Sequence, residues 1–288
     1  MRLDNPGVRC AVGLPNLGDY GDPNLLRELA GRAEAAGWDG VFLWDHMVYR
    51  EPGWPAADPW VSAAAIAAST ERIRLGVLVT PLARRRPWKV ARETASLDVL
   101  SGGRLVVGAG LGSQGPAEFA AFGDEADPRV RAEMLDEGLD ILAGLWSGEP
   151  FSYKGRHHRI EETVFLPRPV QRPRPPVWIA GKWPRRPAFR RAGRWDGVFP
   201  VFEGVGDAEM PPPERLAEAV RYTRDHRHKD GPFDVVLEGQ SEGPDPERVA
   251  AYEAVGLTWW IEKLGWFRGS VDATRERIER GPPVRSSV

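Results

Sequence analysis

The stretch "DPWVSAAAIAASTERIRLGVLVTPLARRRPWKVARETASLDVLSGGRLVVGAGLG" (residues 58–112) decides the fold, because helical and strand patterns alternate twice within it. Its first part predicts a helix, with Asp58 as N-cap and Pro59 in the first turn. An apolar run follows at 73–81, then a helix that ends on glycines, then a second apolar run at 104–112. Continuous apolar strands that alternate with helices are typical of a parallel sheet covered on both faces.

The same alternation continues on both sides of this stretch. It breaks only at residues 147–175, where short strands and a proline-rich loop indicate an insertion between the fourth helix and the fifth strand. Eight strand–helix units in 288 residues most simply close into one (β/α)8 (TIM) barrel domain spanning 1–288. A doubly wound open sheet is disfavoured, because no Gly-x-Gly-x-x-Gly turn follows the first strand. The other six strands are expected at 8–15, 40–44, 176–181, 197–202, 233–239 and 258–264.

Composition excludes several classes of protein. A formal net charge of −2 argues against a dedicated nucleic-acid binder. The single cysteine, Cys10, cannot form an internal disulfide, which fits a cytoplasmic protein. The first residues lack the apolar core of a signal peptide, and no apolar run is long enough to span a membrane. We therefore expect a cytoplasmic protein that binds neither membrane nor nucleic acid.

A barrel of this kind carries its chemistry where the strands end, at the carboxyl side. Asp45 and His46 directly follow the apolar run "GVFLW" of the second strand, so we expect them at the mouth. Carboxylates are few at the other strand ends, and the five histidines have no metal-ligand spacing, so no metal site is expected. Such a mouth suits a flat ligand with polar edges. The remaining strand-end candidates are Asn16, Thr80, Gly110, Gly112, Ser113, Gln114, Gly181, Lys182, Trp183, Glu238, Gly239, Gln240, Ser241, Glu262 and Lys263.

Glycines at the ends of the fourth and fifth strands allow a planar ring or a phosphate to approach the backbone closely. This makes Gly110, Gly112 and the "AGKWP" turn candidate binding positions, where Lys182 either meets a phosphate or is a solvated lysine. The charge run Arg84–Arg86 is interpreted as a solvated face.

Residues 8 to 205 resemble the bacterial-luciferase-like flavin-dependent oxidoreductases. The resemblance rests on the stretch 58–112 and on "PPVWIAGKWPRRPAFRRAGRWDGVFP" (175–200), in which motifs, order and spacing agree. It implies a (β/α)8 barrel, often a homodimer, that holds FMN or the deazaflavin coenzyme F420 in its mouth. By this likeness His46 is the active-site acid/base or a hydrogen-bond donor near the reactive edge of the flavin. Its intrinsic pKa suits proton exchange near neutral pH, and Asp45 orients it or binds elsewhere.

The resemblance also implies a non-proline cis peptide bond at Leu78–Val79, just before Thr80, with these three residues against the flavin ring. One departure concerns the phosphate, because Leu111 stands where some members carry an arginine. Phosphate binding is then left to the backbone around Gly112 and Ser113, to Lys182, or to the turn at Gly239 and Gln240, and the choice between FMN and F420 stays open.

Three functions follow from these patterns. The first is an oxidoreductase acting on a small organic substrate, either an FMN-dependent monooxygenase, with a flavin reductase as a possible partner, or an F420-dependent hydride-transfer enzyme. The second is a barrel hydrolase of glycosidase type that uses Glu238 and Glu262. The third is a flavin-binding protein without turnover. The insertion 147–175 lies either near the mouth or on a dimer surface.

Overall fold

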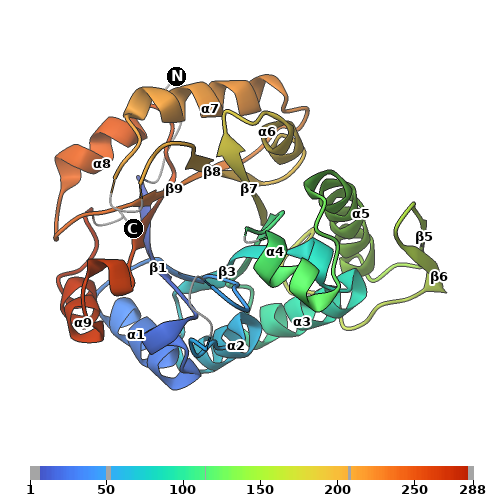
Figure 1. The fold of residues 1–288 in the computed structure, drawn as a ribbon, viewed down its shortest axis with the longest axis horizontal. Coiled ribbons are helices and arrows are strands. Elements are labelled where there is room, and N and C mark those ends of the chain that lie inside the picture. Colours follow the sequence, from blue (N-terminus) through green and yellow to red (C-terminus); the bar gives the residue numbers. More distant parts are fainter. Residues whose placement is uncertain (1–6, 50–52, 114, 207–208, 285–288) are drawn as a thin grey trace.

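Eight parallel strands close into a barrel in the computed structural model, which describes residues 7–49, 53–113, 115–206 and 209–284 (Figure 1). Around the ring the order is β1, β2, β3, β4, β7, β8, β9 and β10, and β10 pairs with β1. The predicted (β/α)8 barrel is therefore confirmed. That residues 1–288 form one domain stays a prediction. The strands are β1 (Arg9–Leu14), β2 (Gly40–Leu43), β3 (Arg74–Pro81), β4 (Leu105–Gly110), β7 (Val177–Trp183), β8 (Gly197–Phe202), β9 (Asp234–Gly239) and β10 (Trp259–Lys263).

Helices cover the outside of the barrel, as Figure 1 shows. Most of them begin at a proline, whose fixed φ and missing N–H suit the first turn. Asp22, Asp58, Asp127 and Asp245 cap four of these helices by accepting backbone N–H groups of the first turn. The helices are α1 (Pro23–Ala35), α2 (Pro59–Ser69), α3 (Pro87–Leu100), the short α4 (Gly115–Glu118), α5 (Pro128–Trp146), α6 (Pro187–Ala192), α7 (Pro213–Asp225), α8 (Pro246–Glu253) and α9 (Val271–Glu279).

The predicted insertion is an antiparallel hairpin, β5 (Phe151–Lys154) and β6 (Arg159–Thr163), that stands outside α5 (Figure 1). Gly144 of α5 lets the Phe151 ring lie against the helix, since a Cβ there would be 2.0 Å from that ring. The Glu137 carboxylate accepts backbone N–H groups from the hairpin turn at 156–158. The strands of the hairpin therefore do not line the barrel mouth.

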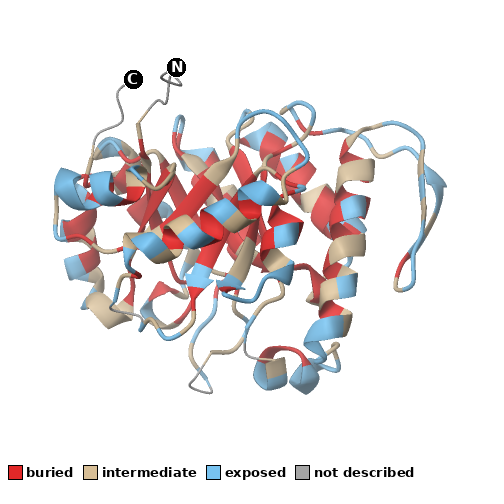
Figure 2. Ribbon diagram, turned by 90° about the horizontal axis from the view of Figure 1, so that it is seen from above, coloured by how far each residue is buried: buried red, intermediate tan, exposed pale blue. Residues whose placement is uncertain are grey.

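Alternate residues of each strand face the barrel axis. Large side chains fill the interior toward the amino ends of the strands, where the ring centroids of Phe42 and Trp178 are 5.0 Å apart. The barrel strands at the centre of the molecule are coloured as buried in Figure 2. Phe199 of β8 is 5% exposed, whereas Val201, two residues on and on the same side of the strand, is 40% exposed. A side chain inside a closed barrel can reach solvent only through an open end, so the barrel is open at the carboxyl ends of its strands.

The peptide bond between Leu78 and Val79 is cis, as expected. The pairing of β3 with β4 shifts between Val77 and Thr80. Both Leu78 and Val79 pack against the inner cluster of the barrel. Within the described ranges, no helix is at once long and apolar enough to cross a membrane.

Closure of the barrel predicts opposite effects for two glycine substitutions. In Gly76→Ala the new Cβ would lie 2.1 Å from the Val106 carbonyl oxygen, so a backbone must move, and we expect a loss of about 3 kcal/mol of unfolding free energy. Gly31→Ala, in α1 with nothing within 4 Å, is the control and should gain about 0.5–1 kcal/mol. Urea unfolding measures both, and a Gly76→Ala protein as stable as the native chain would contradict the close packing of β3 on β4.

Candidate active site

His46 lies at the rim of the mouth, three residues beyond the end of β2. Its backbone is fixed by Asn16, which follows β1 and is fully buried. The Asn16 side-chain amide donates to the His46 carbonyl oxygen at 2.8 Å, and its oxygen accepts the His46 N–H at 3.2 Å. The imidazole is 14% exposed and lies 4.6 Å from the Tyr49 ring, centroid to centroid. The predicted histidine is therefore held at the mouth by a neighbouring strand end.

Glu118, at the end of α4, is the partner of His46. The two carboxylate oxygens lie 3.1 and 3.0 Å from His46 Nδ1, and one of them also accepts the backbone N–H groups of Met47 at 2.7 Å and Val48 at 3.2 Å. The side chain of Glu118 is 1% exposed. Glu118 could not be recognised from the sequence, because a lone glutamate in a glycine-rich loop has no distinguishing pattern.

Arg84 joins this pair to Asp45. Its guanidinium donates to Asp45 Oδ1 at 2.6 Å and to Glu118 Oε2 at 3.2 Å, and all three side chains are 1% exposed. Arg85 also donates to both oxygens of Asp45, at 3.0 and 2.9 Å. The interpretation of Arg84–Arg86 as a solvated face is therefore wrong for Arg84 and Arg85. The Asp45 carboxylate contacts two guanidinium groups rather than His46, so of its two expected arrangements the structure has the one in which Asp45 binds elsewhere. A catalytic role of Asp45 stays a prediction.

The electrostatics of this cluster keep Glu118 ionised. Burial alone would raise the pKa of Glu118. The hydrogen bond from His46, the attraction to His46 and Arg84 and the hydrogen bond from the Met47 N–H outweigh burial and lower that pKa below its ordinary value. At neutral pH the carboxylate is an acceptor for every donor around it.

One wall of the mouth is flat. Gly110, the last residue of β4, has no side chain where a Cβ would lie 3.1 Å from Val79 Cγ2 and 3.5 Å from Ala180 Cβ. In the following loop, Gly112 has φ +75°, and a Cβ there would be 2.9 Å from both Phe119 and Pro81. These glycines leave backbone, Val79 and Ala180 as a surface on which a planar ring can lie.

Aromatic rings form the opposite wall. Trp44 stacks on Phe267, with centroids 6.1 Å apart and an interplanar angle of 9°, and meets Trp266 edge-on at 5.8 Å. The Lys263 ammonium lies 5.9 Å from the Trp44 centroid and 3.7 Å from the Glu238 carboxylate. The charges of this wall are thus paired across β9 and β10.

Two of the other predicted positions, Gly181 and Trp183, do not face the mouth, and Gln114 lies outside the described residues. Trp183 packs outward against Phe189 and Tyr222, and a Cβ on Gly181 would be 2.3 Å from the Ala188 side chain, so both face the helices. The expectation that these two side-chain positions contact a ring in the mouth is corrected. Lys182 and Ser113 are exposed at their strand ends. Thr80 is fully buried, and its Oγ1 has no hydrogen-bond partner among the described residues.

Glu238 and Glu262 lie on opposite faces of the sheet. Glu238 has the inward direction of Val236, whereas Glu262 has the outward direction of Trp260. Glu262 is fully buried and is bound by Ser241, Arg268 and Arg277. Two carboxylates that flank one glycosidic bond must face the same space. The geometry therefore rules out this pair as the catalytic acids of a hydrolase.

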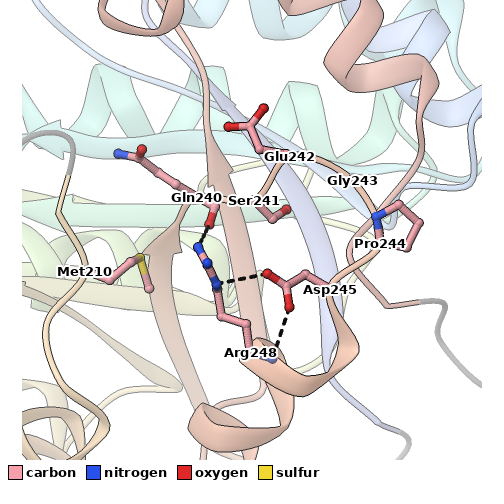
Figure 3. Close-up of a pocket in the computed structure, with 8 residues that line it drawn as sticks. All are labelled: Met210, Gln240, Ser241, Glu242, Gly243, Pro244, Asp245 and Arg248. Carbon is pink, nitrogen blue, oxygen red and sulfur yellow. Dashed lines mark hydrogen bonds and ion pairs between the residues drawn. The ribbon is translucent and has the colours of Figure 1, made fainter.

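A cavity of about 330 Å³ lies beside the end of β9 (Figure 3). Arg248 faces it, but its guanidinium donates to the Gln240 carbonyl oxygen at 2.8 Å and pairs with Asp245 at 2.9 Å. Glu242 adds a second negative charge to the lining. The turn at Gly239 and Gln240 is therefore poorly suited to a phosphate, which leaves Gly112, Ser113 and Lys182. Among the residues that the structure describes, no group of three or more His, Cys, Asp or Glu side chains could hold a metal ion.

Residues 8–240 match the family model described as luciferase-like monooxygenase. An F420-dependent glucose-6-phosphate dehydrogenase of Microbacterium testaceum (strain StLB037) is 34% identical over 176 residues, which cover 60% of this chain and 50% of the relative. Another, of Amycolatopsis mediterranei (strain U-32), is 32% identical over 222 residues, which cover 74% of this chain and 65% of the relative. The chain thus spans between half and 65% of the length of these curated relatives.

Two solved structures are also similar. Monooxygenase RslO1 from Streptomyces bottropensis is 28% identical with a TM-score of 0.67, over 86% of this chain and 75% of that one. The coenzyme F420-dependent tetrahydromethanopterin reductase from Methanopyrus kandleri has a TM-score of 0.76 over 95% and 97% of the two chains. Its identity is 16%, so this likeness shows the fold alone.

Neighbouring arginines of the run 84–86 should differ sharply in their effect on stability. Arg84→Met leaves Glu118 and Asp45 buried with less compensation, and we expect a loss of about 3 kcal/mol or more. Arg86→Met is the matched control, because Arg86 is exposed, and its effect should stay within about 0.5 kcal/mol. Denaturant unfolding measures the free energy of unfolding of both variants. Equal losses in the two variants would contradict a buried, paired Arg84.

Proposed function

The chain belongs to the luciferase-like monooxygenase family, and from this premise we propose that it is an F420-dependent oxidoreductase that transfers a hydride to or from a small organic substrate. The observation that carries the proposal is His46, held at the rim of an open barrel mouth in which Gly110 of β4 leaves backbone without a side chain. F420 is preferred because two curated relatives, 34% and 32% identical to this chain, carry F420-dependent names.

FMN is the second candidate cofactor. It is favoured by the 28% identity to RslO1, a monooxygenase. In that case the protein would act with reduced FMN and oxygen on a small organic molecule, and a flavin reductase would be its partner. The barrel mouth suits the tricyclic ring of either FMN or F420. Measured affinity for each cofactor, and not the shape of the mouth, therefore distinguishes between them.

The flat wall is where we place the ring. Val79, Gly110 and Ala180 offer a face without projecting polar groups, and Leu78 lies just below Val79 in the inner cluster. Thr80 lies fully buried at the same strand end. When bound, the ring supplies the hydride or oxygen chemistry. The backbone N–H groups of Gly112 and Ser113, together with the Lys182 ammonium, are the donors that we assign to the phosphate end.

Residues of the protein supply a proton to the reaction and exclude water from the barrel below the mouth. Phe42, Trp178 and Phe199 fill the barrel below the mouth and exclude water from that side. His46, at the rim, is the group that takes or gives a proton when the substrate hydroxyl or carbonyl reacts. Because its backbone is tied to Asn16, the imidazole is held in a defined position for this exchange.

We also propose a cytoplasmic homodimer. The neighbouring helices α2 and α3 expose Val61, Trp88, Val99 and Leu100, which are 37–61% accessible and would be covered by a second copy. The location is supported by Cys10, a lone and buried thiol whose pKa burial raises to about 12.

Cofactor titration tests the proposed function directly. The purified protein is mixed separately with F420 and with FMN, each oxidised and reduced, and ligand fluorescence is followed. We expect saturable quenching with F420, in a 1:1 ratio per chain. Gly110→Phe, which places a ring on the flat wall, should abolish that quenching, whereas Gly31→Ala should retain it.

Saturable quenching with FMN and not with F420 would make FMN the cofactor in place of F420. Failure to bind either cofactor in any redox state would defeat the proposed function as a whole.

A further inference from the structure

The carboxylate of Glu118 faces Nδ1 of His46, and this contact determines which ring nitrogen carries hydrogen. We propose that it is the positioning residue of His46: its carboxylate selects the neutral tautomer that carries hydrogen on Nδ1, so that Nε2 is the nitrogen that exchanges a proton at the mouth. The proposal rests on the proposed function for its catalytic half, whereas the tautomer is a property of the protein alone.

The Glu118 carboxylate determines the tautomer of the His46 ring. An ionised carboxylate only accepts hydrogen bonds, so the nitrogen facing it must donate. Nδ1 lies 3.1 and 3.0 Å from the two oxygens of Glu118, within hydrogen-bond distance of both. A flip of the His46 ring would break the contact between Nδ1 and Glu118. The buried Glu118 carboxylate would then lose a hydrogen-bond donor, which lowers stability.

Arg84 and two backbone N–H groups hold the carboxylate in place. Oε1 accepts from the N–H groups of Met47 and Val48, and Oε2 accepts from Arg84 at 3.2 Å. Each oxygen therefore has a donor besides His46, which fixes the orientation of the carboxylate plane. The lowered pKa of Glu118 agrees with a group that stays ionised at neutral pH.

The same carboxylate faces the ring during the reaction. When Nε2 takes a proton from the substrate, the ring becomes an imidazolium with its Nδ1–H on the Glu118 carboxylate. The pair is shielded from water, since the two side chains are 14% and 1% exposed, so the attraction is less screened than at a surface. Groups that orient an active-site histidine in this way commonly affect activity about 10–100-fold.

Glu118→Gln is the decisive variant. The amide oxygen should stay with the N–H groups of Met47 and Val48, which require an acceptor, so the amide NH2 takes the place of Oε2, 3.0 Å from Nδ1. There it also meets the Arg84 donor, and this donor–donor contact should lower stability. An amide donor facing Nδ1 favours the opposite tautomer, with hydrogen on Nε2. The variant is therefore expected to invert the tautomer and to remove the negative charge with almost no change of shape.

Nitrogen-15 NMR of the histidine rings reads the tautomer, and His46→Gln identifies the signals by their loss. We expect Nδ1–H for neutral His46 in the native protein and Nε2–H in Glu118→Gln. The matched control is Glu133→Gln, which removes a carboxylate 2.8 Å from His157 Nε2 on the hairpin and should leave the His46 signals unchanged. A native spectrum with Nε2–H overturns the proposal, and it can be read even where the variant fails to fold.

Kinetics tests the catalytic half with any substrate that supports F420 reduction. Glu118→Gln should lower kcat about 100-fold with KM and cofactor affinity unchanged, and Glu133→Gln should change none of them. An inverted tautomer with native kcat would overturn this half. Loss of cofactor binding by the native protein would instead count against the proposed function, since the NMR result does not depend on it.

Discussion

The mouth of this barrel depends on one buried guanidinium. Arg84, which follows β3, binds Asp45 from the end of β2 and Glu118 from the loop after β4, and so ties three successive strand ends together. Exposed ion pairs, such as Arg32 with Glu279, contribute little in water. In contrast, removing one member of a buried set leaves an uncompensated charge, which typically costs about 3–5 kcal/mol.

Asp45 and His46 are adjacent in the sequence but have different surroundings in the structure. Asp45 is taken up by Arg84 and Arg85 and organises the strand ends, whereas His46 keeps contact with the mouth. The orienting carboxylate comes from Glu118, on the far side of β3, rather than from the neighbouring aspartate. The histidine at this strand end is thus held by charges that come from three loops.

The fold could be predicted because each strand is a continuous apolar run and each helix has its own start signal. The position of His46 followed from the same reasoning, since strand ends meet at the mouth. The direction of side chains could not be predicted, because a strand alternates its faces: Trp183 and Glu262 therefore turned outward, and Glu238 turned inward. Nor could the sequence reveal that acids from two distant segments surround Arg84, because that contact forms only when the barrel closes.

The central claim is that the imidazole of His46 and the wall at Gly110 face one shared binding space. A crystal structure of the protein with bound F420 tests it most directly. We expect a ring that lies on Val79, Gly110 and Ala180, with its reactive edge turned toward His46 Nε2. A ring seated elsewhere, for example in the cavity beside Arg248, or an imidazole screened from the ligand by packed side chains, would contradict it.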